Sequence, residues 1–370
     1  MKLKQIKVSG FKSIGNSPPQ EVTFDDVTIL LGANGAGKSN VVSLMRLLGS
    51  LTTGTLQQFV GKMGVRQLLF RGPKMTESMR FAVMLDADDK TSIYDITLSH
   101  GLPDRLFVSS ERVSDQQPGQ PRPQEYVLSE GGSEARLAED ERPTSRMLTA
   151  LLRGIQTFQF HDTSDTARIK DRVYVEDARY LRRDAGNLAA FLKRLQDSPN
   201  HRRYYERIVR HVRSIMPQFG DFMLEPLTEN ERYLRLNWID SDRGDYLFGP
   251  DQISDGSLRF MALTTLLMQP PELLPKVIVI DEPELGLHPA AIRELAGMIK
   301  RTSVYAQLVL ATQSTRLVDE FSPHQVVVVE RDSTIGSSVC KRLDADSLAD
   351  WLTHYTLSEL WEKNVLGGQP

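Results

Sequence analysis

A glycine-rich stretch near the N-terminus has the residue types and spacing of a phosphate-binding loop. Residues 32–39, here called the phosphate loop, read Gly-Ala-Asn-Gly-Ala-Gly-Lys-Ser and separate an apolar run at 27–31 from a run with helical spacing. In this strand–loop–helix context, backbone N–H groups and the helix dipole favour phosphate. Lys38 would contact the β- and γ-phosphates of a nucleoside triphosphate, and the Ser39 hydroxyl would bind Mg²⁺. The other residues expected to surround the phosphates are Asn34, Gly35, Ala36, Gly37 and Asn40.

The alternative for this stretch is a glycine-rich turn that binds nothing. It is disfavoured because both the full spacing and the flanking elements are present. Gly49 is placed to end the helix that follows the loop.

A second candidate for chemistry is an acidic pair that ends an apolar run. Asp281 and Glu282 follow the β-branched residues of 277–280, which predict a buried central strand. The carboxyl end of such a strand lies beside the phosphate loop, so Asp281 can hold Mg²⁺ and Glu282 can orient or deprotonate water. The pair could instead cap the next helix. Pro289 suits the first helical position, however, which makes His288 the better cap.

Two further polar stretches adjoin predicted elements. Ser254, Asp255 and Gly256, here called the signature start, open an apolar helix and make a second anion-binding N-terminus. One nucleotide rarely needs two such helix starts from one chain. The simplest arrangement is therefore a dimer in which each signature start covers the γ-phosphate held by the other copy. Gln313 ends an apolar strand at 308–312, where it would sense that phosphate; a plain strand-to-helix turn is the alternative.

Composition bounds the class of protein. The 370 residues carry 45 Lys and Arg against 48 Asp and Glu, a net charge of −3, so any surface for nucleic acid must be local. Cys340 is the single cysteine, which excludes a disulfide framework and suits a reducing cytoplasm. The N-terminus is too polar for a signal peptide, and no apolar run is long enough to span a bilayer. We expect a cytoplasmic protein without membrane contacts.

The predicted elements fall into three segments. Residues 1–142 contain an edge strand at 2–9, the phosphate loop, and a series of antiparallel strands with a mobile, proline-rich loop at 115–124. Residues 143–218 are predicted to be a helical insert. Residues 219–370 alternate strand and helix, as in a parallel sheet covered on both faces. The expected fold class is therefore α/β, with a mixed or parallel core sheet, an antiparallel β-subdomain and an inserted helical subdomain.

The helical segment collects basic charge. Residues 168–213 contain 13 Lys and Arg against 6 Asp and Glu, a local excess of seven positive charges. A solvated helical face explains this run as well as a surface for a DNA backbone or an acidic partner does. The arginines to test are Arg179, Arg182, Arg183, Arg202, Arg203 and Arg207.

The order of these motifs resembles the ATP-binding-cassette head of the RecF/SMC-like ATPases. The narrower resemblance is to short AAA-type ATPases related to the ATPase domain of overcoming-lysogenisation-defect proteins. The broader resemblance also rests on residues 285–289, and the narrower one on three further stretches at 11–14, 186–192 and 359–368.

This resemblance implies a Mg²⁺-dependent ATPase that forms a head-to-head homodimer around two ATP molecules. The signature start would act in trans, residues 285–289 would form the D-loop that crosses the dimer, and Lys12 would touch phosphate or DNA. Gln313 stands where many cassette ATPases have a histidine, so the switch cannot titrate near neutral pH, and slow or partner-gated hydrolysis is expected. The candidates for the Q-loop glutamine are Gln57, Gln58 and Gln67.

The resemblance also bears on partners. Several related ATPases carry a TOPRIM-type nuclease, and Glu330, Asp344 and Asp346 mimic its acidic residues. Only 40 residues follow Glu330, however, too few for a domain of ~100 residues. We therefore expect a sensor or scaffold for a separately encoded nuclease or toxin in bacterial anti-phage defence. An ATP-gated DNA-binding protein of recombination or repair is the alternative, and a transporter motor is disfavoured.

Overall fold

The computed structural model describes residues 1–87, 90–116, 123–242 and 246–369. The chain forms two compact units. Unit 1 comprises residues 1–157, 275–279 and 307–370, and unit 2 comprises residues 158–274 and 280–306. The three-part division expected from the sequence stays a prediction.

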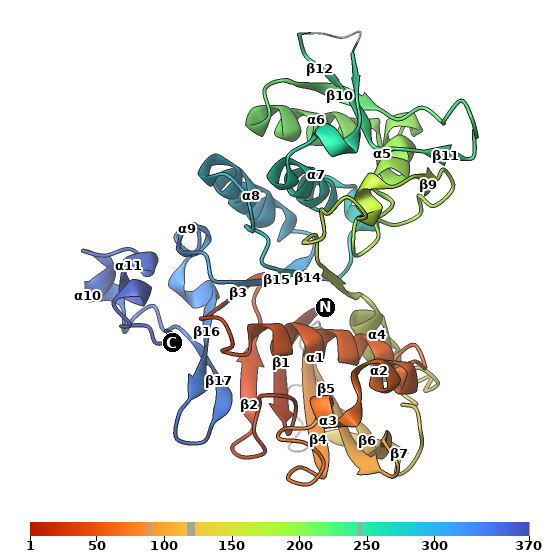
Figure 1. Cartoon of the computed structure of the whole chain (residues 1–370). Helices are drawn as coiled ribbons and strands as arrows, with labels where there is room; N and C mark the ends of the chain where they lie inside the picture. The colour runs from red at the N-terminus through yellow and green to blue at the C-terminus, as the bar shows by residue number, and fades with distance from the viewer. Residues whose placement is uncertain (88–89, 117–122, 243–245, 370) are drawn as a thin grey trace. The chain divides into compact units, whose positions relative to one another are not determined.

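A mixed six-stranded sheet carries the phosphate loop (Figure 1). Its strands are β3 (Val27–Leu31), β8 (Ile155–Phe158), β14 (Val277–Asp281), β15 (Gln307–Thr312), β16 (Val326–Asp332) and β17 (Ser337–Arg342). Their order is β17-β16-β3-β15-β14-β8. β3 runs parallel to β15 and β16, whereas β17 pairs antiparallel with β16. Every residue of β3 and β15 is buried, as expected for strands covered on both faces.

A second six-stranded sheet of unit 1 is antiparallel, which confirms the expected β-subdomain. Its strands are β1 (Lys2–Ser9), β2 (Gln20–Thr23), β4 (Ser78–Ala87), β5 (Lys90–Gly101), β6 (Arg105–Gln116) and β7 (Gln124–Ser129), in the order β2-β1-β4-β5-β6-β7. The prediction that residues 2–9 form an edge strand is wrong, because β2 folds back and pairs with the outer side of β1. Of the loop expected at 115–124, residues 117–122 lie outside the described residues.

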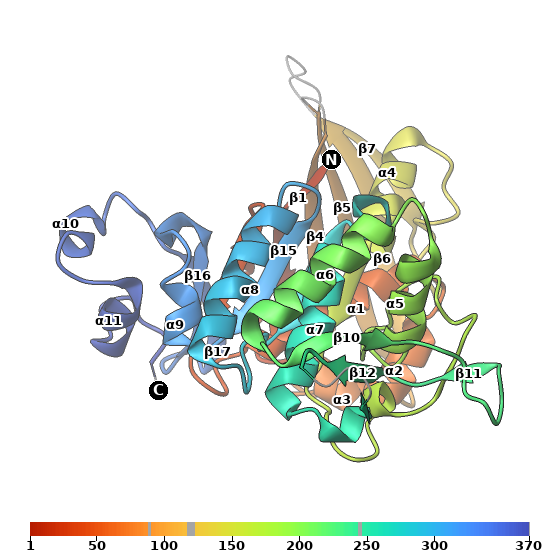
Figure 2. The same ribbon diagram turned by 90° about the horizontal axis from the view of Figure 1, so that it is seen from above.

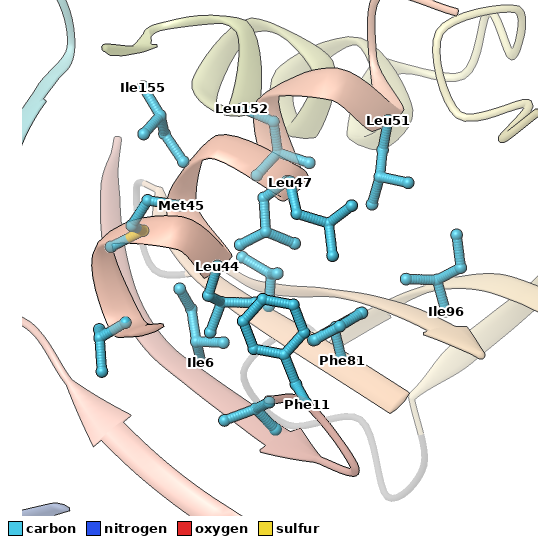
Figure 3. Packing of buried hydrophobic residues seen from close by; sticks show 14 of the residues in the cluster. Ile6, Phe11, Leu44, Met45, Leu47, Leu51, Phe81, Ile96, Leu152 and Ile155 are labelled. Carbon is cyan, nitrogen blue, oxygen red and sulfur yellow. The ribbon is translucent and has the colours of Figure 1, made fainter. Parts of the chain in front are cut away.

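Helix α1 fixes the phosphate loop to the core of unit 1. The helices of this unit are α1 (Lys38–Leu51), α2 (Leu56–Met63), α3 (Val65–Leu68), α4 (Pro143–Arg153), α9 (Thr315–Val318), α10 (Ala349–Leu352) and α11 (Leu357–Glu362). Figure 3 shows Leu44 and Leu47 of α1 among Phe81 and other residues of one hydrophobic cluster. Each fully buried leucine contributes about 2 kcal/mol. The prediction that Gly49 ends α1 is wrong. The helix continues to Leu51, whose side chain is buried in the same cluster.

Unit 2 contains only part of the region expected to be helical, because α4 lies in unit 1 and the described residues 154–187 contain no α-helix. Its helices are α5 (Leu188–Asp197), α6 (Arg202–Ile215), α7 (Asp255–Met268) and α8 (Pro289–Thr302), and its short strands are β9 (Val173–Tyr174), β10 (Phe219–Met223), β11 (Tyr233–Leu234), β12 (Asn237–Asp240) and β13 (Leu247–Phe248). Helices α6, α7 and α8 lie side by side (Figure 2). The Thr302 hydroxyl donates to the Leu267 carbonyl at 2.8 Å and ties α8 to α7. Within the described residues, no helix combines the length and apolar character needed to cross a lipid bilayer.

Candidate functional site

The N-terminus of α1 has the features of an anion-binding site. Gly37 is its N-cap residue and has a φ of 119°, in the left-handed region that favours glycine. No side chain caps the helix, and its first turn contains no acidic residue. The partial positive charge of this 14-residue helix is therefore left for an anionic ligand rather than for a side chain of the same chain.

Lys38 is folded onto the phosphate loop. Its side chain is buried, with 5% of the residue exposed, and its Nζ atom donates to the carbonyls of Gly32 at 2.6 Å and Ala33 at 3.0 Å. The ammonium is thus hydrogen-bonded to two backbone carbonyls of the loop itself. Because a phosphate oxygen is negatively charged and adds ionic attraction to the hydrogen bond, the Lys38 side chain can exchange these carbonyls for a triphosphate.

The donor set also fits Mg²⁺ bound together with a triphosphate. Ser39 is exposed at the start of α1. In the described part of the chain, no cluster of three or more His, Cys, Asp or Glu side chains could hold a metal by itself. Mg²⁺ takes most of its ligands from substrate phosphates and water and needs only one or two protein groups. The magnesium site stays a prediction.

Two serines brace the phosphate loop from other parts of unit 1. The Ser338 hydroxyl donates to the Ala36 carbonyl at 2.5 Å and lies 2.7 Å from Ser13 Oγ, which also accepts from Asn40 Nδ2 at 2.6 Å. A Cβ atom on Gly37 would lie 2.3 Å from Ser338 Oγ, so the close approach requires glycine. Sequence reasoning included Ser13 in a family stretch without a role, and it missed Ser338 because no local signal places β17 beside the loop.

The acidic pair lies at the end of β14. Asp281 is the last residue of the strand, and its carbonyl accepts from His161 Nε2 at 2.9 Å. Glu282 has a φ of 43°, an uncommon value for a residue with a side chain, and such strain gathers at functional sites. As predicted, His288 caps α8 by accepting from the Ala290 N–H at 3.3 Å. The acidic pair is thus not the cap of α8.

The signature start lies against the expected D-loop within unit 2. Ser254 caps α7 by accepting from the Ser257 N–H at 3.2 Å. A Cβ atom on Gly256 would lie 2.3 Å from the Gly286 carbonyl oxygen. Arg259 Nη1 donates to the Leu285 carbonyl at 3.3 Å. The first turns of α7 therefore pack against residues 285–286. The roles of both segments in a dimer stay a prediction.

Lys12 precedes Ser13, which accepts from Asn40, and has a φ of 49°. Burial, together with the nearby Arg46, lowers the pKa of its ammonium. It lines a hollow of about 530 Å³ in unit 1. Gln67 lines the same hollow, whereas Gln57 donates to the backbone carbonyls of Leu106 and Ser133. The other residues around the hollow are Ser13, Asn40, Arg66, Leu69, Arg71 and Gly72.

Gln313 follows β15 and is half-buried, immediately before Ser314, which caps the short helix α9.

The arginines selected in the basic region are engaged locally. Arg182 pairs with Asp177 at 2.6 Å and Arg202 with Glu206 at 3.4 Å. The guanidinium groups of Arg203 and Arg207 lie 4.8 Å and 5.4 Å from the ring centroid of Tyr204, and that of Arg179 lies 5.3 Å from the ring of Tyr180.

Comparison with known proteins identifies one matching family. The profile described as "AAA domain, putative AbiEii toxin, Type IV TA system" matches residues 27–319. Similar proteins include the energy-coupling factor transporter ATP-binding protein EcfA2 of Staphylococcus aureus (strain bovine RF122 / ET3-1), 30% identical over 115 residues, and EcfA2 of Ligilactobacillus salivarius (strain UCC118), 32% identical over 111 residues. Each match covers 30% of this chain, and the chain spans only 38% and 36% of the respective relatives.

Two solved structures share the fold at 15% sequence identity. One is an SmcHead bound to the C-winged helix domain of ScpA, with a TM-score of 0.56 over 95% of this chain and 100% of that one. The other is an Smc head domain with an extended coiled coil, bound to the C-terminal domain of ScpA derived from Pyrococcus furiosus, with a TM-score of 0.54 over 95% and 98%. These likenesses confirm the expected α/β fold, which is that of an SMC head domain.

Proposed function

The chain belongs to the AAA domain family described as a putative AbiEii toxin of type IV toxin–antitoxin systems, and we propose that this ABC/SMC-like ATPase dimerises around ATP. In this proposal the dimer acts as a sensor or scaffold for a separately encoded effector. The observation that carries the proposal is the N-terminus of α1, where an uncapped helix start adjoins the buried ammonium of Lys38. The effector is a nuclease or toxin of bacterial anti-phage defence.

In this proposal the residues have distinct tasks in hydrolysis. Lys38 and the backbone N–H groups of the phosphate loop bind the phosphates. Ser39 and Asp281 hold Mg²⁺, which neutralises charge on the phosphate oxygens when it is bound. Glu282 orients the attacking water and accepts its proton. Gln313 contacts the γ-phosphate through an amide, which does not titrate near neutral pH.

A second copy of the chain completes the proposed site. The signature start begins a 14-residue helix that Ser254 caps and that has Asp255 in its first turn, unlike α1. We assign the remaining N–H groups of this helix start to the γ-phosphate of the partner copy. The D-loop residues next to it would cross the same dimer. ATP occupancy then sets the dimer geometry, and the effector recognises this geometry.

DNA binding is the second candidate, and the basic run at 168–213 favours it. Against it, the local pairing of Arg182 and Arg202 with carboxylates reduces the charge available to phosphates. A transporter motor is disfavoured for two reasons. The likeness to EcfA2 is confined to 30% of this chain, and the chain contains a central helical region.

The test uses the Glu282→Gln variant, which should bind ATP but hydrolyse it slowly. Co-expression with the neighbouring genes, followed by purification with ATP and Mg²⁺, is expected to yield a complex with a neighbouring gene product. DNA binding that appears only with ATP and weakens steeply with salt would favour the DNA-binding alternative instead. A protein that binds neither ATP nor a neighbour would contradict the proposal.

A further inference from the structure

A segment distant in sequence is hydrogen-bonded to the phosphate loop within unit 1. The Ala33 N–H donates to the Gly368 carbonyl at 2.9 Å. The carbonyl of the same peptide unit, that of Gly32, accepts from Lys38 Nζ at 2.6 Å. One peptide unit is therefore held on its amide side by Gly368 and on its carbonyl side by the lysine that binds phosphate in the proposed function.

The Gly368 carbonyl is itself held in place. Gly367 and Gly368 both have a φ of 79°, in the left-handed region, and the Gly368 N–H donates to Glu330 Oε2 at 3.0 Å. A Cβ atom on Gly368 would lie 2.7 Å from Val328 Cγ1, and one on Gly367 would lie 2.6 Å from Glu330 Oε2. Conformation and space both require glycine at these positions. Glu330, whose position had suggested a nuclease acid, therefore orients this segment.

The same segment is tied to the helix that follows Gln313. Residues 357–369, here called the strap, begin with α11, which contacts α9. Ser358 donates to the Asp319 carboxylate through its N–H at 2.8 Å and its hydroxyl at 2.6 Å. Trp361, which is 7% exposed, packs the middle of the strap, and its carbonyl accepts from Gln369 Nε2 at 3.1 Å. The strap thus joins the phosphate loop to the chain segment after Gln313.

We propose that the strap positions the phosphate loop for ATP, with Glu330 and Gly368 as positioning residues. A docked strap fixes the Gly32–Ala33 peptide, so the loop keeps its shape when Lys38 leaves the Gly32 carbonyl for a phosphate. An undocked strap leaves that peptide free to rotate, and ATP binds more weakly. By linkage, bound ATP favours the docked strap to the same extent. This inference rests on the proposed ATP site and adds a means of regulating it.

Three variants and one matched control test the proposal. Gly368→Ala introduces the clash with Val328, Glu330→Ala removes the acceptor, and Glu330→Gln keeps an acceptor oxygen. Gly54→Ala is the control, because Gly54 also has a positive φ, of 62°, but faces open space. For each protein, the Kd of a fluorescent, slowly hydrolysed ATP analogue is measured with Mg²⁺, alongside KM, kcat and thermal unfolding.

We expect Gly368→Ala and Glu330→Ala to weaken binding of the analogue by roughly fivefold to tenfold, the loss typical of one hydrogen bond. KM should rise more than kcat falls, Glu330→Gln should recover most of the affinity, and Gly54→Ala should bind as the unaltered protein does. Equal affinities in all variants would overturn the proposal. If the unaltered protein does not bind the analogue, the proposed function fails instead.

A second measurement, made on the unaltered protein, tests the proposal even if the variants do not fold. Hydrogen–deuterium exchange is followed with and without the ATP analogue. Slower exchange at residues 357–369 on adding the analogue is the expected result. Exchange of the strap that is unaffected by an analogue shown to bind would overturn the coupling.

Discussion

The Ser338 hydroxyl donates to the carbonyl of Ala36 at 2.5 Å, although 302 residues separate the two. The Ser338 N–H also donates to the Ser13 carbonyl at 2.7 Å. The phosphate loop is therefore held by β17 and by the turn after β1, in addition to its own flanking elements. This bracing keeps the loop backbone in one shape before any ligand binds, which reduces the ordering cost of binding.

The variant Ser338→Ala removes the hydroxyl bonds of this brace and keeps the backbone bond to Ser13. We expect the free energy of unfolding to fall by about 1 kcal/mol, the usual contribution of a hydrogen bond, and ATP affinity to fall severalfold. Isothermal titration with a slowly hydrolysed analogue measures the affinity. Ser92→Ala is the control, because Ser92 is buried in the antiparallel sheet and its hydroxyl donates to Asp115 at 2.8 Å. An equal loss of affinity in both variants would mean that the effect is one of general stability.

The variant Lys38→Met keeps the apolar stem of the side chain but removes its charge. Since a hydrogen bond to a charged group contributes roughly 1.5–3 kcal/mol, we expect ATP affinity to fall by at least about tenfold. Circular dichroism should show an unchanged fold. Lys62→Met, in the exposed last turn of α2, should bind ATP normally. Undiminished ATP binding by Lys38→Met would remove the basis of the proposed site.

Part of this structure follows from local sequence alone. The strand before the phosphate loop was predicted with its observed bounds of Val27 to Leu31, and the cap of α8 was predicted at His288, because apolar runs, glycine and proline act over a few residues. The strands that pair with β1 were not predicted, since strand pairing depends on segments that lie elsewhere in the sequence. Ser338 was missed, and Gly368 was included in a family stretch without a role, for the same reason: their contacts with the loop join segments that lie far apart in the sequence.

The half-buried thiol of Cys340 predicts a pH dependence. Burial raises its pKa from 9.0 to about 12, so the folded protein holds the thiol proton more tightly than the unfolded chain does. Stability from this group is present below pH 9 and is lost as the pH rises from 9 toward 12. At pH 8 the thiol of the folded protein stays protonated, so a thiol-specific reagent should react slowly with the native protein and more rapidly with the denatured one. Rapid labelling of the native protein at pH 8 would contradict this prediction.

Removal of Mg²⁺ should separate binding from hydrolysis. With excess chelator, we expect phosphate release to stop, because Ser39 and Asp281 would no longer hold the ion that neutralises phosphate charge. ATP binding through Lys38 should weaken but persist, as followed with a fluorescent analogue. Hydrolysis that continues at its full rate in chelator would rule out the assigned metal role of these two residues.

The central claim is that one chain supplies only half of the ATP site. Its most direct test is the mass of the Glu282→Gln variant, measured by light scattering during gel filtration, with and without ATP and Mg²⁺. We predict the 41.7 kDa mass of one chain without nucleotide and about twice that mass with ATP, with Lys38→Met remaining a monomer in both conditions. A variant that binds ATP tightly but keeps the mass of a single chain would contradict the claim.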